Sequence, residues 1–236
     1  MTNIHVPVAV VSPLLLKMVA LPWRSTMFPV SLLLCVILML QLHVVAPITA
    51  FSAWDHTLYD FTSPAISTAN WEEVSDTVRE VGMSKATLDI VPSKAGNQRA
   101  VFFSLLNPQP DGACFAGMVD RFSPSQNWSG VRSVRVNARA QGSNSVYKII
   151  LNDGNHASGL AFEHVFAVVK GEQFNDYSLD LSDFVCSFRG RPCPDNVLDV
   201  TNIASFGFQM AGGVYDSYKQ TGVSSLEISR VHIRSY

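Results

Sequence analysis

Apolar and polar residues alternate with a period of two along much of the chain. The alternation is clearest from Val134 to Ala140, where apolar residues stand at the even positions and Arg or Asn at the odd positions. A strand with one face on a core and the other in water has this pattern. This segment therefore predicts a half-buried strand of an antiparallel sheet.

Similar runs recur, separated by clusters of Gly, Pro, Asn and Asp that end regular structure. In the last run the apolar phase shifts at Ser229 and Arg230, as a β-bulge would produce. Segment 183–200 is expected to be mostly loop. Strands are predicted near 58–61, 71–75, 86–91, 99–106, 114–121, 134–140, 146–151, 160–169, 174–181, 203–210 and 224–234.

The spacing of these strands predicts the fold. Because no convincing helical period extends beyond about two turns, we expect an all-β domain over residues 55–236. Short strands with frequent turn signals are typical of an antiparallel β-sandwich, and a jelly roll is the natural architecture. Trp71 and Leu88 are expected in its core, with a loop from Asp76 to Ser84 between them.

The first fifty residues read as a targeting leader. The 18 residues from Phe28 to Val45 are almost wholly apolar, Lys17 and Arg24 precede them, and no acid occurs before Asp55. This order is that of a signal peptide, and cleavage is predicted between Ala50 and Phe51. An uncleaved signal-anchor is the alternative, since the run is just long enough to span a bilayer. A mitochondrial presequence would be richer in Arg and amphipathic.

Charge narrows the range of partners. Without Lys17 and Arg24 of the leader, the rest of the chain has 15 basic and 19 acidic residues. Nucleic-acid partners favour a basic face, so none is expected. The membrane is expected to be contacted only through the N-terminal segment, if that segment is retained.

Cysteines and a sequon agree with secretion. Cys186 and Cys193 enclose a Gly-Arg-Pro turn, and such a short loop closes readily into a disulfide in an oxidising compartment. Cys114 is then left over and is expected to be buried. Asn127-Trp128-Ser129 is an N-glycosylation sequon in a loop-like segment. The cysteines and histidines lack paired ligand spacing, so no metal site is predicted.

Several segments together resemble a known family. L-Y-D-F-T-S, W-E-E-V-S-D-T-V with a following Gly and S-K-A, S-V-Y-K-I-I-L-N, I-A-S-F-G-F-Q-M and S-S-L-E-I-S-R-V-H-I are similar to the complex I intermediate-associated protein 30 domain family. The resemblance covers about Leu58 to Ile233. It implies a galactose-binding-domain-like β-sandwich without catalysis, whose mitochondrial members act as chaperone-like assembly factors for respiratory complex I. The sequence departs from the family at Arg79 to Gly82, where the family has Gly-Gly.

The chain has no motif of a known catalytic class. It lacks a G-x-S-x-G elbow, a phosphate-binding glycine loop and H-E-x-x-H, so no catalytic residue and no cofactor are predicted. Loops at one end of a sandwich commonly carry a binding site. Three loops have suitable residues: 107–112, 152–156 with Asn152, Asp153 and His156, and 212–220 with Tyr215 and Tyr218. Tyrosines beside Asp or Asn suit sugar recognition, or simply pack the loop against the sandwich.

Two functions follow from these observations. The first is a non-enzymatic domain that binds a protein partner, such as an assembly intermediate. The second is a secreted module that binds carbohydrate or a glycoprotein. The leader favours the secretory pathway or the extracellular space, whereas the family resemblance implies a mitochondrion.

Overall fold

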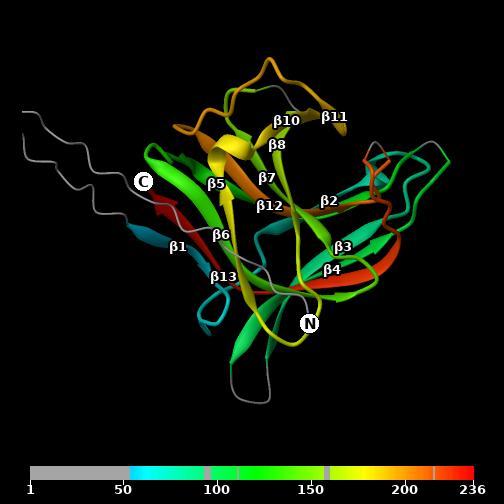
Figure 1. Ribbon diagram of the computed structural model, residues 1–236, viewed down its shortest axis with the longest axis horizontal. Coiled ribbons are helices and arrows are strands. Elements are labelled where there is room, and N and C mark those ends of the chain that lie inside the picture. Colours follow the sequence, from blue (N-terminus) through cyan, green and yellow to red (C-terminus); the bar gives the residue numbers. More distant parts are fainter. Residues whose placement is uncertain (1–53, 93–96, 111, 157–159, 215) are drawn as a thin grey trace, which may run out of the picture. The chain divides into compact units, whose positions relative to one another are not determined.

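Figure 1 shows the computed structural model of the chain, which describes residues 54–92, 97–110, 112–156, 160–214 and 216–236. The chain divides between Ala50 and Phe51, and all described residues belong to the second part. The predicted cleavage site at Ala50 and Phe51 and the predicted site residue Tyr215 lie outside the described residues.

The described part of the chain forms two antiparallel sheets. One has the order β3-β4-β13-β6-β9, and β1 also pairs with β13; the other has the order β11-β10-β8-β7-β12-β5-β2. The strands are β1 (Asp55–Asp60), β2 (Trp71–Ser75), β3 (Lys85–Pro92), β4 (Gln98–Leu106), β5 (Phe115–Gln126), β6 (Val131–Gly142), β7 (Val146–Asp153), β8 (Leu160–Ala167), β9 (Asn175–Asp180), β10 (Val185–Phe188), β11 (Arg191–Pro192), β12 (Ile203–Ala211) and β13 (Gly222–Ser235). The all-β sandwich predicted from the sequence is confirmed.

The register of β13 explains its shift of apolar phase. Its first half pairs with β4 and its second half with β1, while β6 follows it along the other side. The pairing with β6 shifts between Ile228 and Arg230, so Ser229 forms the predicted bulge. Beyond the bulge the inward positions are Val231 and Ile233, and both are buried.

Segment 183–200 lies mostly outside strands, as predicted, but it includes one short hairpin that was not predicted. It contains the hairpin of β10 and β11, preceded by a 3-10 turn, Leu181–Asp183. Arg189 and Gly190 form its two-residue turn and both have positive φ, as hairpins of this length require. A four-residue strand is too short to show an alternation. Its pairing with β8, which is a tertiary contact, decides its conformation.

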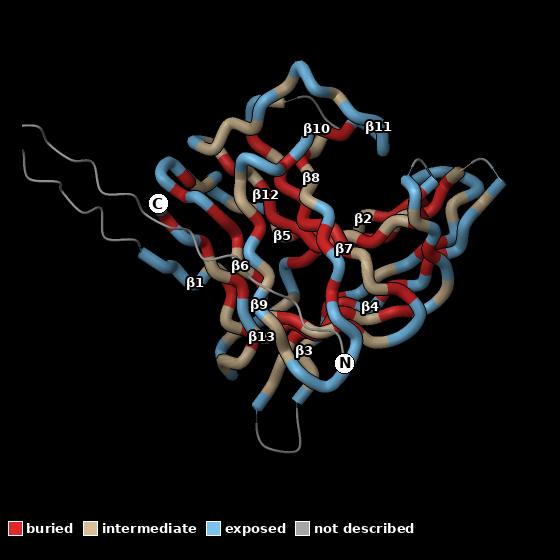
Figure 2. The backbone as a smooth tube through the Cα atoms, viewed as in Figure 1, coloured by how far each residue is buried: buried red, intermediate tan, exposed pale blue. Residues whose placement is uncertain are grey.

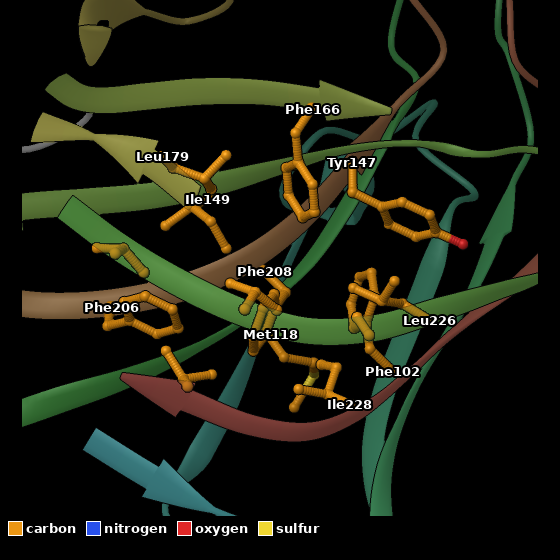
Figure 3. Packing of buried hydrophobic residues seen from close by; sticks show 14 of the residues in the cluster. Phe102, Met118, Tyr147, Ile149, Phe166, Leu179, Phe206, Phe208, Leu226 and Ile228 are labelled. Carbon is orange, nitrogen blue, oxygen red and sulfur yellow. The ribbon is translucent and has the colours of Figure 1, made fainter. Parts of the chain in front are cut away.

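Buried residues lie mainly along the strands of the two sheets (Figure 2), and aromatic side chains from the inward faces form the core (Figure 3). Phe102 comes from the six-stranded sheet, and its ring centroid lies 6.3 Å from that of Phe208 in the other sheet. Phe208 also packs against Phe206 at 5.3 Å and stacks on Trp71 at 5.8 Å. Trp71 and Leu88 are buried, as predicted.

The loop between β2 and β3 is held by a buried carboxylate. Asp76 is fully buried and accepts hydrogen bonds from Ser84 N at 2.8 Å, Ser84 Oγ at 2.7 Å and Phe115 N at 3.2 Å. Gly82 makes this closure sterically feasible, because a Cβ there would lie 1.8 Å from the carbonyl oxygen of Asp76. The Ser-Asp and Gly-x-Ser parts of the motif therefore close one loop.

Replacing Asp76 with Ala is expected to lower the free energy of unfolding by about 3 kcal/mol, because the buried N–H and O–H donors lose their acceptor. Urea unfolding followed by tryptophan fluorescence measures it. Asp89→Ala is the control, since Asp89 is exposed and should change stability by less than about 0.5 kcal/mol. Equal losses in the two variants would contradict this role of Asp76.

Candidate functional site

The outer face of the seven-stranded sheet carries a groove of about 1160 Å³. It lies on that face because β7 alternates: Tyr147, Ile149 and Leu151 enter the core, so Lys148 and Ile150 point outward. Residues from β2, β5, β8, β10 and β12 complete the walls and floor, among them Val74, Val119, Glu163, Ser187 and Gln209.

An ion pair lies on the floor of the groove. Lys148 Nζ donates to Glu163 Oε2 at 3.1 Å, across the β7–β8 pairing. Only 9% of the Lys148 side chain and 15% of the Glu163 side chain are exposed. Because a charge this deeply buried is costly without its partner, each side chain fixes the position of the other. The groove thus presents a donor and an acceptor at a defined point.

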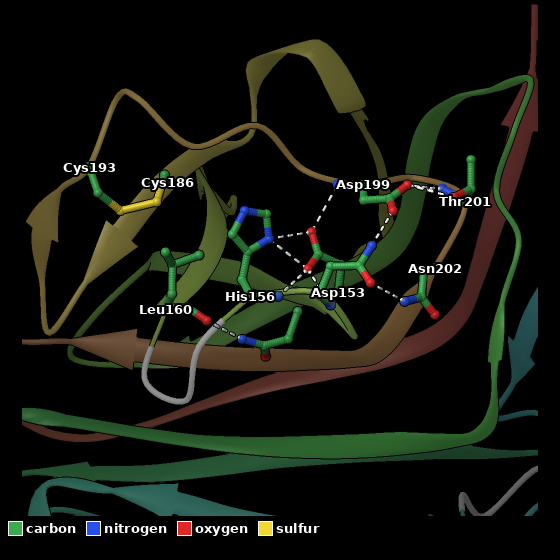
Figure 4. A network of polar contacts seen from close by, with 10 residues as sticks. Asp153, His156, Leu160, Cys186, Cys193, Asp199, Thr201 and Asn202 are labelled. Atoms are coloured by element: carbon green, nitrogen blue, oxygen red, sulfur yellow. Dashed lines mark hydrogen bonds and ion pairs between the residues drawn. A yellow bond between two sulfur atoms is a disulfide. The ribbon is translucent and has the colours of Figure 1, made fainter.

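A carboxylate network closes one end of the groove (Figure 4). The two oxygens of Asp153 lie 2.7 and 2.8 Å from His156 Nδ1, and one of them also accepts from Asp199 N at 2.8 Å. The Asp153 side chain is fully buried, while a quarter of the His156 side chain is exposed. Asp153 thereby ties the β7–β8 turn to the segment before β12.

Two opposing influences act on the pKa of Asp153. Burial raises it, but hydrogen bonds from Asp199 N, the His156 ring and Asn155 N outweigh burial and lower the pKa below its usual value. Asn152, the neighbouring predicted residue, donates from Nδ2 to Leu160 O at 2.6 Å and accepts from Ser205 Oγ at 2.9 Å. Both side chains are thus held by the scaffold.

The other end of the groove is bounded by segment 212–220. Lys219 Nζ donates to the carbonyl oxygens of Gly213, Val214 and Asp216, which holds the described part of this loop in a tight turn. Burial and, to a smaller extent, a hydrogen bond with Asp216 raise the pKa of Tyr218 above its ordinary value. Tyr218 is half-buried and does not line the groove, whereas Gly213, Val214 and Asp216 of this segment do.

The predicted loops do not gather at one end of the sandwich. Asp153 pairs with Ile203 at the start of β12, whereas segment 212–220 follows the end of β12. Gly212 N donates to Cys114 O, so Cys114, which follows the predicted loop 107–112, lies at the second end. The sequence does not give strand direction, so it could not place these loops relative to one another. Residues of both ends line the same groove.

Lys148 and Glu163, which the sequence analysis missed, lie between these ends. Their only signal in the sequence is a charge at an outward position of an otherwise apolar strand. Such a charge is ordinarily read as solvated. The burial of this pair depends on the concave packing of neighbouring strands, which a linear pattern does not contain.

The other predicted residues have defined surroundings. Cys186 and Cys193 form the predicted disulfide, which closes the β10–β11 hairpin, and Cys114 is a buried free thiol. Asn127 is exposed, while Trp128 beside it is buried. Within the described ranges, no cluster of His, Cys, Asp or Glu could hold a metal ion. The same ranges contain no helix long and apolar enough to cross a membrane.

Solved structures of other proteins have a similar fold. A family 11 carbohydrate-binding module from Clostridium thermocellum, in complex with a β-1,3-1,4-mixed-linked tetrasaccharide, is similar with 17% identity and a TM-score of 0.54 over 76% of this chain and 94% of that chain. A family 11 module from a cellulosomal cellulase of Clostridium thermocellum is similar with 17% identity and a TM-score of 0.55, over 78% of this chain and 95% of that chain. An exo-beta-agarase is similar with 13% identity and a TM-score of 0.51, over 77% of this chain and 25% of that chain. The chain thus shares the β-sandwich fold of these solved structures.

Comparison of the sequence with protein-family models identifies the family of this chain. Residues 59–228 match the family described as complex I intermediate-associated protein 30. The chain belongs to this family. No curated protein matches the sequence.

Asp153→Asn is expected to destabilise the protein by about 1–2 kcal/mol at pH 7, because the anion and its hydrogen bonds are lost. A carboxyl whose pKa is lowered by folding contributes stability above its unfolded pKa of about 3.9 and loses it as the pH falls through the folded value. The difference between wild type and variant should therefore shrink below about pH 4. Chemical denaturation at pH 7, 5 and 3 measures it; a pH-independent difference would contradict the assignment.

Proposed function

We propose that this protein is a non-catalytic binding domain that holds a protein partner, such as an assembly intermediate, in the groove of the seven-stranded sheet. Membership of the complex I intermediate-associated protein 30 family supports a role in assembly. The groove offers both apolar and charged contacts along several strands. An extended or partly folded protein segment needs contacts of both kinds.

The observation that carries this proposal is the composition of the groove floor. Between its ends the floor is built from Val119, Ile150 and Gln209 beside the Lys148–Glu163 pair. Sugar recognition favours a flat aromatic ring that stacks on the sugar. Among the described lining residues, Phe115 and Phe122 are the aromatic side chains other than His156, and Phe122 packs on Trp128 with ring centroids 6.5 Å apart. Aliphatic groups with one buried ion pair suit a peptide better.

The polar end of the groove also supports a non-catalytic role. Asp153 and His156 are paired as in a catalytic triad, yet no serine or cysteine side chain within the described ranges is hydrogen-bonded to the His156 ring. A nucleophile within hydrogen-bond reach of the base is what acyl transfer requires. The buried carboxylate of Asp153 instead holds the β7–β8 turn against the segment before β12.

Carbohydrate binding is the second candidate. It is supported by the fold shared with a family 11 module solved with a tetrasaccharide. Asn152, His156 and Asp216 would supply polar groups along the groove to read hydroxyls. At 17% identity this likeness concerns the fold, so the ligand has to be tested directly.

Filling the groove is expected to abolish partner binding. Gln209→Trp places a large ring on the floor, and the tagged variant should no longer migrate with a larger complex on native gels of its own cell extract. Gln141→Trp is the matched control on the outer face of the other sheet and should leave the complex intact. Loss of the complex in both variants, or in neither, would sink the proposal.

The same two variants separate the second candidate from the first. Wild-type protein and the Gln209→Trp variant are applied to an array of β-linked glucans and other glycans. If the groove binds a protein, the two should be retained equally or not at all. Retention by wild type and by Gln141→Trp, but not by Gln209→Trp, would replace the protein ligand with a carbohydrate.

We further propose that the protein enters the secretory pathway through its leader. The Cys186–Cys193 disulfide is consistent with an oxidising compartment, and Asn127 is exposed in the sequon. This location would separate the present protein from complex I itself. A retained leader would give a membrane anchor, and a mitochondrial location is the alternative implied by the family.

Expression in cells of its own source is expected to give a glycosylated protein. Digestion with an endoglycosidase should reduce its apparent mass, and Asn127→Gln should abolish this shift because the acceptor amide is gone. Ser125→Ala, two residues away and outside the sequon, is the control and should retain the shift. Co-purification with mitochondria and resistance to the enzyme would overturn the secretory assignment.

A further inference from the structure

A second pocket, of about 440 Å³, lies on the outer face of the six-stranded sheet. It is separate from the groove, which belongs to the other sheet. Three arginines line it: Arg99 from β4, Arg139 from β6 and Arg230 from β13. Thr62, Gln98 and Ser229 add hydroxyl and amide groups at its edge.

The three strands bring these arginines together through their register. Arg139 pairs with Glu227 across β6 and β13, and Glu227 pairs with Val101 across β13 and β4. Arg99 lies two residues from Val101 and so shares its outward face. The bulge at Ser229 then turns Arg230 outward, because Val231 becomes the buried position. Without the bulge Arg230 would face the core.

The charges of this cluster do not cancel. Glu227 Oε2 accepts from both Arg99 Nε and Arg139 Nη2, so one carboxylate serves two guanidinium groups. Asp60 accepts from Arg230 Nε at 3.2 Å. Three guanidinium groups thus share two carboxylates, those of Glu227 and Asp60. Among the described residues that line the pocket, the charged side chains are all arginines.

One donor of the cluster has no acceptor. Arg139 Nη1 donates to Glu172 O and Nη2 to Glu227, whereas Nε is buried without a partner among the described residues. Nε and Nη2 share one edge of the guanidinium, the edge that takes carboxylates and phosphates; Glu227 already accepts from Nη2, so Nε is the donor of that edge left for a further acceptor. Phe174 lies under the group, with its ring centroid 4.8 Å from Arg139 Cζ, and holds the plane in place.

We propose that this pocket binds a tetrahedral oxyanion, a phosphate or sulfate group carried by a small molecule. Such a group presents at least three oxygens in different directions, which matches guanidinium groups arriving from three neighbouring strands. A carboxylate presents two oxygens in one plane and would therefore bind fewer of the three guanidinium groups. The volume beyond the arginines accommodates a small polar carrier that Thr62 and Gln98 contact. This site is independent of the proposed partner groove.

Isothermal titration of the purified chain with inorganic phosphate, sulfate and acetate tests the proposal. Phosphate or sulfate should bind saturably, more tightly than acetate, and less tightly as NaCl is raised. Arg230→Gln should weaken binding about tenfold, because one charged donor is removed. The side chain of Arg230 is 49% exposed, so the substitution leaves the fold intact.

Arg234→Gln is the matched control. Arg234 lies on the same strand with 50% of its side chain exposed, is paired with Asp55 at 3.9 Å, and lies outside the pocket. It should leave anion affinity unchanged, and so should Gln209→Trp in the groove. No saturable binding of either oxyanion up to about 20 mM, equal binding of acetate, or equal losses in both arginine variants would each overturn the proposal.

Discussion

The fold depends on the packing of the two sheets through Phe208. Its ring meets Phe206 and Trp71 within the seven-stranded sheet and Phe102 from the other sheet. Because side chains alternate along each strand, placing these rings inside decides which residues appear outside. Lys148 and Gln209 thereby reach the groove, and Arg139 and Glu227 reach the opposite outer face. Both candidate binding surfaces follow from how the core is packed.

The segment from Ser75 to Ser84, which carries part of the family resemblance, has a structural role. Asp76 is buried, and its carboxylate closes the loop onto Ser84 and the start of β5. Gly82 is needed because the carbonyl of Asp76 occupies the space of a side chain. One glycine is enough for this closure, so the loss of the family's Gly-Gly at Arg79 to Gly82 leaves the loop intact. The segment therefore has a structural role in closing this loop.

The groove and the arginine pocket use charge in different ways. In the groove, Lys148 and Glu163 neutralise each other and leave aliphatic surface around them. In the pocket, Glu227 is shared between two arginines, so positive charge is left for a ligand. A neutral floor suits a broad partner whose contacts are spread over several strands, whereas an excess charge suits a compact anion. The two faces of the sandwich therefore favour ligands of different chemistry.

The sequence by itself determined most of the strands, the bulge in β13, the disulfide and the inward residues of β6. Each of these depends on local periodicity, on short loop closure or on residues that end strands, all of which act over a few positions. It did not reveal the β10–β11 hairpin, whose strand of four residues is stabilised by β8. It also could not show that Asn152, Asp153 and His156 lie at the opposite end of β12 from Tyr218. Only the tertiary structure decided which loops share an end and which outward charges are buried, because both depend on strand order across a sheet and not on neighbours in the chain.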